Sequence, residues 1–345
     1  MEKANDIVAG FDIGGAHLKV TRAEHGRIVA AATLATPLWL GLDRLASALQ
    51  EAAPLYSGAS LHAFTMTGEL SDIFPSREAG VVALLQQISE HFPSGERLIY
   101  AGQSGFVGIE EAARLIMEVA SANWHATAAL VAKLAGDALF VDMGSTTTDL
   151  IAVRQGKVAN QGFTDAERLL TGELVYTGFT RTFLFGVASS APVRGRLTPL
   201  MNEYFASIAD VHRILGVLDE ANDKHPAADG KEKTVEASTA RLARIIGRDA
   251  ADLTKREWLD VARWFSEQQL RLVHDAAFRV AGPLSDDTSI VGAGTGRWQI
   301  RRLAGRMERR FLDLADIIPA DDAVRSQASS AAPAAAVALL ASERW

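Results

Sequence analysis

The amino-acid sequence contains no cysteine. Disulfide bonds, thiolate nucleophiles, cysteine-ligated zinc sites and cysteine-ligated iron–sulfur clusters are therefore excluded. The eight histidines include no pair spaced as His-x-x-x-His or His-Glu-x-x-His, so the usual zinc-hydrolase pattern is missing too. The chemistry of this chain must be carried by carboxylates, hydroxyls, amides, isolated histidines and backbone groups.

Basic residues are fewer than acidic ones, 35 against 42, and long apolar runs are missing. The 345 residues carry a formal net charge of −7, which argues against a nucleic-acid partner held by bulk charge. The alanine-rich stretch Ala331–Ala341 is shorter than the roughly 18 apolar residues that a membrane-spanning helix needs, so no membrane partner is expected. The first residues lack a basic stretch followed by an apolar segment, so no secretory signal is expected either. These absences predict a cytoplasmic protein, and at about 150 residues per domain its length predicts two domains.

An internal repeat is the most informative feature that the sequence does contain. Residues Phe11–Ala30 align without a gap with Val141–Asn160. The aligned pairs include Asp12 with Asp142, Gly14 with Gly144, Gly26 with Gly156, Arg27 with Lys157 and Ile28 with Val158. Each copy has the pattern of three short strands, with an Asp-x-Gly turn after the first and a polar-glycine turn before the third. The repeat predicts two domains of like topology, at 1–137 and 138–345, each with a β-meander at or near its start.

The remaining pattern mixes helices and strands, which places the chain in the α/β class. Strands are expected at Leu61–Met66, Arg97–Ala101 and Thr288–Val291. Helices are expected at Leu42–Ala52, Glu78–His91, Glu110–Trp124, Ala126–Leu134, Leu200–Leu218, Thr239–Ile246, Arg256–Val280, Trp298–Phe311 and Ser329–Ser342. We interpret residues 195–280 as a helical insertion in the second domain, with Asp219–Lys233 as a mobile loop. Asp210 and His212 are expected on a solvated helix face, and the closing helix is compatible with packing back on the first domain.

The Asp-x-Gly turns have a definite chemical use. Glycine lets the backbone approach a ligand, so that consecutive N–H groups converge on an anion. In the second turn, Ser145, Thr146 and Thr147 add hydroxyl donors to the same hollow. Asp12 and Asp142 offer the oxygen ligands that Mg²⁺ prefers. The two turns therefore predict phosphate binding with Mg²⁺.

Two further features support phosphate binding in this context. Lys19 offers a point charge to a phosphate, although a lone lysine on a strand is commonly just solvated. Gly292, Gly294 and Gly296 follow a predicted strand and precede a predicted helix, so their backbone can pass close to a nucleotide or another polar ligand. This motif lacks the spacing and the βαβ setting of a dinucleotide fingerprint. A single Asp-x-Gly turn is commonly an ordinary hairpin, whereas three glycine turns after apolar strands favour phosphate binding.

In this order, the three turns resemble those of the superfamily that contains the acetate and sugar kinases, the heat-shock cognate protein and actin. Further segments narrow the resemblance: FDIGGAHLK, TMTGELSDIFPSREAGV (Thr65–Val81), SANWHATA (Ser121–Ala128), VDMGSTTTDLI, YTGFTRT (Tyr176–Thr182) and SIADVHRILG (Ser207–Gly216). Together they are similar to the hydantoinase/oxoprolinase-like family linked to tetrahydromethanopterin-dependent one-carbon metabolism. The resemblance covers essentially the whole chain. It implies a two-domain actin/hexokinase-like (ribonuclease H-like) fold in which two hairpins grip phosphates from either side of a cleft.

The resemblance also implies an activity that is unusual for this fold. Characterised archaeal members are similar to a synthase of methanofuran biosynthesis, which joins an aminomethyl-furan methyl diphosphate to the phenol of γ-glutamyltyramine and releases diphosphate. In methylotrophs it implies an acceptor with a tyrosine-type phenol, as in methylofuran. Mg²⁺ and backbone N–H groups would stabilise the leaving diphosphate, and a base would take the phenol proton, whose ordinary pKa is about 10. ATP is compatible with such a site, although the reaction does not require it.

Site residues are transferred only where this sequence matches the family's motifs. The resemblance implies a first phosphate motif of Asp12, Gly14, Gly15 and Lys19, a second of Asp142, Gly144, Ser145, Thr146, Thr147 and Asp149, and a third, next to substrate or nucleoside, of Gly292, Gly294 and Gly296. In this interpretation Asp12 and Asp142 are catalytic through the Mg²⁺ that they hold.

Five polar residues outside the turns are further candidates. Glu69 and Asp72 would meet the aminomethyl group or accept a proton, or else they belong to an ordinary loop or helix start. Asn123 and His125 would lie at a helix end, with His125 as the candidate catalytic base or as a structural histidine. Arg181 would pair with a carboxylate of the acceptor or make a surface salt bridge.

Other functions stay open at this point. A small-molecule kinase would need a carboxylate base at the cleft wall of the first domain, and Gly102–Phe106 offers no acid there. An ATP-dependent hydantoinase or oxoprolinase is suggested by the family, although such enzymes are generally longer or work with a partner subunit. A non-enzymatic nucleotide switch would need a peptide-binding or polymerising module larger than the predicted insertion. The sequence is also compatible with a homodimer formed through this insertion.

Overall fold

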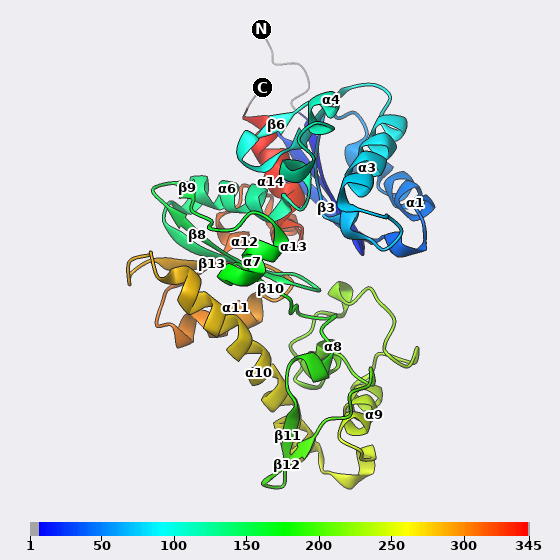
Figure 1. The fold of residues 1–345 in the computed structure, drawn as a ribbon, viewed down its shortest axis with the longest axis vertical. Coiled ribbons are helices and arrows are strands. Elements are labelled where there is room, and N and C mark those ends of the chain that lie inside the picture. The colour runs from blue at the N-terminus through cyan, green and yellow to red at the C-terminus, as the bar shows by residue number, and fades with distance from the viewer. Residues whose placement is uncertain (1–6, 344–345) are drawn as a thin grey trace. The chain divides into compact units, whose positions relative to one another are not determined.

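The computed structural model describes residues 7–343 (Figure 1). The first six residues, on which part of the expectation about a secretory signal depends, lie outside the described residues. The chain divides into two compact units. Unit 1 contains the chain up to Phe140, Ile151–Asp165 and the chain from Leu312 onward, whereas unit 2 contains Val141–Leu150 and Ala166–Phe311. Three stretches of the predicted second domain, at 138–140, 151–165 and from 312 onward, therefore group with the first unit.

Unit 1 contains a six-stranded sheet that begins with a β-meander. Its strands are β1 (Ile7–Ile13), β2 (His17–Glu24), β3 (Arg27–Ala35), β4 (Leu61–Met66), β5 (Glu96–Tyr100) and β6 (Phe106–Val107), in the spatial order β3-β2-β1-β4-β5-β6. β1, β2 and β3 pair antiparallel, and β4 runs parallel to β1. In this register Asp12 lies opposite Lys19 on one side and Thr65 on the other. The predicted meander is confirmed, and so are the two strands predicted after it.

Alternation along β1 sends its side chains to two helical layers. Phe11 packs in one apolar cluster with α1 (Asp43–Glu51) and α3 (Arg77–His91). Gly10 points the other way, where a Cβ would overlap with the backbone of α14 (Ala332–Ser342). Because glycine and alanine are small, this closing helix, red in Figure 1, approaches the blue strands closely. The other elements here are α2 (Ala53–Tyr56), α12 (Leu314–Ile317), α13 (Arg325–Ser330) and the 3₁₀ turns η1 (Leu38–Leu40), η2 (Gly68–Leu70), η3 (Gly102–Ser104) and η7 (Asp322–Val324).

The predicted helix at Glu110–Trp124 is wrong. The chain forms two single-turn helices, α4 (Ile109–Ala112) and α5 (Ile116–Val119), before α6 (Asn123–Ala135) begins. Ser121, just before α6, has a φ of +54°, in the left-handed region. An α-helix cannot continue through such a residue, so the apolar periodicity of this stretch belongs to separate turns that share one buried side.

The second sheet repeats the topology of the first. Its strands are β7 (Ala138–Met143), β8 (Thr148–Arg154), β9 (Lys157–Val158), β10 (Leu174–Val175), β13 (Ser289–Gly294) and β14 (Phe311–Asp313). The order is β10-β8-β7-β13-β14, and β9 also pairs with β8. Residues 11–20 and 141–150 share one pattern of burial, position by position. Two meander-based sheets with matching strand order are the duplicated α/β arrangement of the actin- and hexokinase-like fold.

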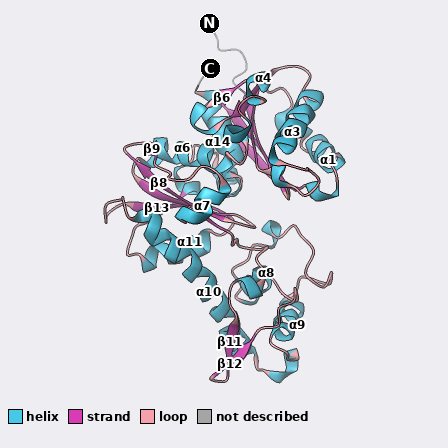
Figure 2. Ribbon diagram, in the orientation of Figure 1, coloured by secondary structure: helices cyan, strands magenta, loops and turns pink. Residues whose placement is uncertain are grey.

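Unit 2 also contains the predicted insertion, which is less helical at its start than expected. A hairpin of β11 (Ser190–Val193) and β12 (Arg196–Pro199) lies near its beginning (Figure 2). The predicted helix Leu200–Leu218 is reduced to α8 (Ile208–Ile214), because a capping box of Ser207 and Asp210 starts the helix there. The remaining elements are α7 (Asp165–Thr171), α9 (Val235–Ile245), α10 (Lys255–Ala281), α11 (Arg297–Arg306) and the 3₁₀ turns η4 (Leu184–Gly186), η5 (Glu220–Asn222) and η6 (Ala250–Asp252). None of the helices within residues 7–343 combines the length and hydropathy that crossing a membrane requires.

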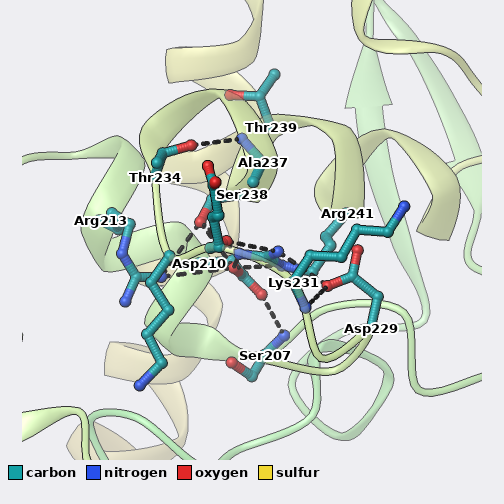
Figure 3. Close-up of polar contacts among 12 residues, drawn as sticks. Ser207, Asp210, Arg213, Asp229, Lys231, Thr234, Ala237, Ser238, Thr239 and Arg241 are labelled. Carbon is teal, nitrogen blue, oxygen red and sulfur yellow. Dashed lines mark hydrogen bonds and ion pairs between the residues drawn. The ribbon is translucent and has the colours of Figure 1, made fainter. Parts of the chain in front are cut away.

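Asp210 lies at the centre of a buried ion network rather than on a solvated face (Figure 3). Its network contains Arg213, Ser238 and Arg241 on the helices and Asp223 and Asp229 in the loop between them, joined at 2.7–3.6 Å. The buried Arg241 guanidinium bridges Asp210, at 2.9 Å from Oδ1, and Asp229, at 3.1 Å from Oδ1. His212 is completely buried as well, so the predicted solvated face is wrong for both residues. The loop predicted to be mobile is tied to α8 and α9 by these ion pairs.

Candidate functional site

The first turn lies at the end of β1 in unit 1. Asp12 is almost completely buried, and Lys19 Nζ, directly opposite on β2, lies 3.1 Å from Asp12 Oδ2. The Gly14 N–H donates to His17 O at 2.9 Å and closes the hairpin, while the space beside Gly15 is open. Asp12 Oδ1 is buried and has no hydrogen-bond partner within the described part of the chain. One oxygen of this carboxylate is therefore left for a ligand.

The second turn has the same backbone closure in unit 2. The Gly144 N–H donates to Thr147 O at 3.0 Å. Asp142 is buried at the end of β7, and the hydroxyls of Ser145 and Thr146 lie 3.4 Å apart on the partly exposed turn. Hydroxyls and backbone N–H groups on a tight turn form the kind of hollow that binds phosphate. Each unit thus has one buried aspartate directly before a glycine turn.

The loop at residues 177–181, which contains the predicted site residue Arg181, holds the second turn. Gly178 packs so closely on the turn that a Cβ would overlap with the backbone of Ser145. The Arg181 N–H donates to Ser145 O at 2.9 Å, and its guanidinium Nη1 lies 3.5 Å from Thr146 Oγ1. The structure therefore brings Arg181 to the second turn. The family-like segment YTGFTRT was the signal that could have identified this loop.

Two buried side chains hold the same loop by hydrogen bonds to its backbone carbonyls. The His212 Nδ1–H donates to Phe179 O at 2.9 Å, and the two rings stack with centroids 3.9 Å apart. Complete burial lowers the pKa of His212 to about 4, so its ring is neutral at neutral pH. Gln269 Nε2 donates to Gly178 O at 2.7 Å. Because the Phe179 N–H also donates to Gly144 O at 2.8 Å, this support reaches the turn itself.

The third glycine motif follows β13 and also reaches the second turn. Gly294 has a φ of +82°, and a Cβ there would overlap with Asp142 Oδ1 and Met143 O. The Gly296 N–H donates to Met143 O at 2.9 Å. Gly292 instead packs beneath an aromatic ring of β14. The structure thus brings Gly294 and Gly296 to Asp142 and gives Gly292 a place in the core.

The other predicted carboxylates have different surroundings. Glu69, in η2, is buried; its Oε1 accepts a hydrogen bond from Ser121 Oγ at 2.6 Å, and burial raises its pKa. Asp72 is exposed in the turn before α3. Asp149, on β8, pairs with the buried Arg168 at 2.7 Å. Of these three, only Glu69 is enclosed without an ion-pair partner in the part of the chain that the structure describes.

Asn123 and His125 begin α6 in unit 1. The Asn123 Oδ1 accepts the N–H of Trp124 at 2.7 Å. His125 Nδ1 lies 2.9 Å from the Tyr100 hydroxyl, and its buried ring lies 6.0 Å from that of Phe163. This is the environment of a histidine held in an aromatic cluster, and its assignment as the base stays a prediction.

The carboxylates of the two turns are the candidate ligands for a metal ion. Among residues 7–343, no group of three or more histidine and acidic side chains is arranged to hold a metal by itself. Mg²⁺ keeps several waters and commonly binds through one or two carboxylates together with phosphate oxygens. The unpartnered Asp12 Oδ1 and the buried Asp142 beside its glycine turn fit that mode. Mg²⁺ would therefore arrive with the phosphates rather than occupy a preformed cage.

A surface hollow lies elsewhere in unit 1. It is lined by the start of β5 and by α4, including Glu96, Arg97 and Arg114. Since β5 runs parallel to β4, which in turn runs parallel to β1, this hollow lies at the end of the sheet opposite to the first turn. No predicted site residue lines it.

The chain is similar to known proteins over most of its length. The hydantoinase/oxoprolinase family model matches residues 60–343. A protein from Methanocaldococcus jannaschii named (4-{4-[2-(gamma-L-glutamylamino)ethyl]phenoxymethyl}furan-2-yl)methanamine synthase is 30% identical over 97% of each chain. The protein of the same name from Methanococcus vannielii is 33% identical over 36% of this chain and 55% of its own length.

Solved structures cover nearly the whole chain at low identity. Component A of the (R)-2-hydroxyglutaryl-CoA dehydratase of Acidaminococcus fermentans has 12% identity and a TM-score of 0.48 over 98% of both chains. A glucokinase of the ROK family from Streptomyces griseus has 15% identity and a TM-score of 0.47 over 96% of this chain and 98% of its own. With these values, nothing about activity follows from either structure.

Both curated relatives are named as synthases, so this chain is an enzyme. The family match extends over most of the sequence, and the similarity to the M. jannaschii protein extends over almost all of it. The protein belongs to the hydantoinase/oxoprolinase family.

Proposed function

We propose that the protein is an ether-forming transferase of methanofuran or methylofuran biosynthesis. It would condense an aminomethyl-furan methyl diphosphate with the phenol of a tyramine- or tyrosine-type acceptor and release diphosphate. The observation that carries this proposal is the 30% identity to a synthase of that product type over 97% of both chains. Small-molecule substrates and a leaving diphosphate are consistent with two glycine turns that each follow a buried aspartate.

The reaction balances without an oxidant or reductant. The bond between the furan-methyl carbon and the diphosphate oxygen breaks, and diphosphate leaves with the electron pair. The phenol oxygen forms the new bond to that carbon, and its proton passes to a base. An electron-rich furan ring stabilises positive charge on the attached carbon, so the main demand on the protein is to stabilise the leaving group.

The turns supply groups of the kind that this demand requires. Backbone N–H groups and the hydroxyls of Ser145, Thr146 and Thr147 can donate to diphosphate oxygens, and such preorganised donors are worth most where charge develops. Asp12 and Asp142 would hold Mg²⁺, which when bound neutralises charge on the diphosphate. Lys19 Nζ lies 3.1 Å from Asp12 Oδ2 and holds that carboxylate in place.

The acceptor side is less defined than the diphosphate side. Arg181, beside Thr146, offers a guanidinium that matches a carboxylate in geometry and charge. An acceptor with a free carboxylate, such as tyrosine or a γ-glutamyl derivative, would use it, whereas tyramine itself would not. His125 is retained as the candidate base, although its ring is buried against Tyr100.

An ATP-dependent kinase or a hydantoinase-type ATPase is the alternative, because the duplicated glycine turns also suit a nucleotide. A kinase needs a carboxylate base that takes the proton of the acceptor hydroxyl. The stretch Gly102–Phe106 contains no such side chain. We therefore favour the synthase.

The experiment incubates the purified protein and Mg²⁺ with the furan diphosphate and either γ-glutamyltyramine, tyrosine or tyramine, and separately with ATP. We expect the coupled ether by mass spectrometry, diphosphate in the phosphorus NMR spectrum and no ATP turnover. Asp12→Asn and Asp142→Asn should each lower kcat by about 100-fold, while Asp286→Asn, an exposed acid in a distant turn, should not. Conversion of ATP to ADP without ether formation would replace the synthase with the kinase or ATPase.

A further inference from the structure

Glu69 is fixed beside the first turn by the backbone around it. η2 follows β4 directly, and the Thr67 N–H donates to Ile13 O, at the end of β1, at 2.9 Å. A Cβ on Gly68 would lie 3.1 Å from the same carbonyl oxygen. On its other side, Gly80 of α3 packs so closely that a Cβ would overlap with the Glu69 backbone. The backbone of Glu69 is therefore held in a fixed position next to the backbone of the first turn.

Only one of the two carboxyl oxygens of Glu69 has a partner. Oε1 accepts from Ser121 Oγ at 2.6 Å, and the residue as a whole is 1% exposed. Oε2 is buried and has no hydrogen-bond partner among the residues that the structure describes. Buried polar atoms are almost always paired with protein or a bound species, so an unpaired carboxyl oxygen at this place points to a ligand.

The residue that holds Glu69 is itself strained. Ser121 has a φ of +54°, a backbone conformation that few residues other than glycine adopt. Strain of this kind gathers where a side chain must be held in one place for function. Here it presents the serine hydroxyl to Oε1 and leaves Oε2 free. The strain and the unpaired oxygen are independent observations that concern the same carboxyl group.

The charges around Glu69 favour a cationic ligand. Arg77 is the nearby positive side chain, and it pairs with Asp165 at 3.0 Å. An ammonium group has three N–H donors and no acceptor, so it can both satisfy Oε2 and supply the missing positive charge. A neutral hydroxyl can do only the first. Burial raises the pKa of Glu69, and a bound cation would oppose that effect.

We propose that Glu69, positioned by Ser121, binds the primary ammonium group of the substrate, namely the aminomethyl group on the furan. The assignment rests on the proposed function, because that function supplies the amine. The role is one of recognition, since no bond to the amine forms or breaks. It gives unit 1 an ammonium subsite next to a phosphate turn, so the furan would be held by its charged ends.

The test measures binding of furfurylamine and of furfuryl alcohol by titration calorimetry, in the presence of Mg²⁺ and inorganic diphosphate. The wild-type protein should bind the amine at least tenfold more tightly than the alcohol at pH 7. Glu69→Gln should bind both equally, and Ser121→Ala should reduce the preference several-fold. Glu78→Gln, an exposed acid at the start of α3, is the matched control and should keep the full preference. The preference should fall as the pH is lowered, because the carboxyl becomes protonated.

Equal binding of the two ligands by the wild-type protein would overturn the proposal. A preference that survives in Glu69→Gln would do the same. If Glu69→Gln does not fold, the wild-type pH profile and Ser121→Ala decide. A preference that is independent of pH between 4 and 7 and unchanged in Ser121→Ala would then exclude the carboxylate.

A second assay separates this proposal from the proposed function. The coupling reaction is run with the furan diphosphate and with its analogue that lacks the aminomethyl group. Equal kcat/KM for the two would overturn the ammonium site and leave the synthase intact. A preference for furfurylamine without any ether formation would support the ammonium site and overturn the synthase.

Discussion

His212 contacts the second turn indirectly, through the backbone of Phe179. Its neutral ring donates to Phe179 O, and the Phe179 N–H donates in turn to the Gly144 carbonyl of the turn. A charged imidazolium in this fully buried place would lose its hydration, which is why burial lowers the pKa of His212 to about 4. The geometry of the turn is therefore coupled to the protonation state of one residue behind it.

This coupling predicts acid sensitivity. The unfolded chain binds a proton at this histidine near pH 6.5, whereas the folded protein binds it only near pH 4. The free energy of unfolding should therefore fall as the pH drops from 6.5 to 4, by about 3 kcal/mol at most from this residue.

Chemical denaturation at pH 7 and pH 4.5 measures the effect. His212→Asn keeps a donor for Phe179 O and does not titrate, so its stability should depend less on pH than that of the wild type. His274→Asn, at a partly exposed position of α10, is the control and should retain the wild-type slope. The same slope in His212→Asn as in the wild type would contradict the prediction.

The sequence predicts some site residues and misses others for a physical reason. Asp12, Gly14 and their counterparts are recognisable because a turn depends on residues next to one another in the chain. Gly178 and Gln269 are not, because their contacts join segments up to 91 residues apart. The burial of Asp210 and His212 was missed for the same reason.

At the scale of elements, the loop at residues 177–181 is the structural support of the second turn. Gly178→Ala would place a Cβ within the backbone of Ser145, so the loop must shift away from the turn. We expect a loss of about 1–3 kcal/mol in stability and at least a tenfold loss in coupling rate.

Gly186→Ala is the matched control, since the space around that glycine is open. Thermal unfolding and the coupling assay on both variants check the prediction. Wild-type activity in Gly178→Ala would show that the loop does not support the turn.

The ion network in Figure 3 makes the loop at 219–233 part of the insertion's core. Arg241→Met would leave Asp210 buried without its closest cation, at a cost of about 3–5 kcal/mol. Arg244→Met removes an exposed partner of Asp229 and should cost less than about 1 kcal/mol.

Urea denaturation of the two arginine variants, compared with the wild type, tests this difference. Equal losses would mean that the buried pair contributes no more than the surface pair. The composition of this charged, turn-rich sequence predicts a mobile loop, but its charges pair with residues of the two helices that flank it, which composition alone does not reveal.

Helix boundaries were predictable where local signals mark them. The capping box of Thr254 and Glu257 starts α10 one residue before the predicted position. The break at Ser121 has no such local signal: this serine has a left-handed backbone, and its hydroxyl donates to Glu69, 52 residues away in the sequence.

At the scale of the whole molecule, one sequence repeat predicts most of the topology. Both sheets begin with the aligned meanders and share the order of five strands. The packing of α14 against β1 could not be predicted from the sequence alone. It depends on the fit of alanines of α14 against Gly10, which lie at opposite ends of the chain. The repeat also explains why two buried aspartates occupy equivalent positions.

The most direct test asks which bond breaks in the furan diphosphate. The oxygen that bridges the furan-methyl carbon and phosphorus is labelled with ¹⁸O, and the products of turnover with a phenolic acceptor are examined by phosphorus NMR and mass spectrometry. A synthase that breaks the carbon–oxygen bond leaves the label in the released diphosphate and forms an unlabelled ether. Label in a furan alcohol, or a phosphorylated acceptor, would mean that a phosphorus–oxygen bond breaks instead, and the protein would then be a phosphoryl-transfer enzyme.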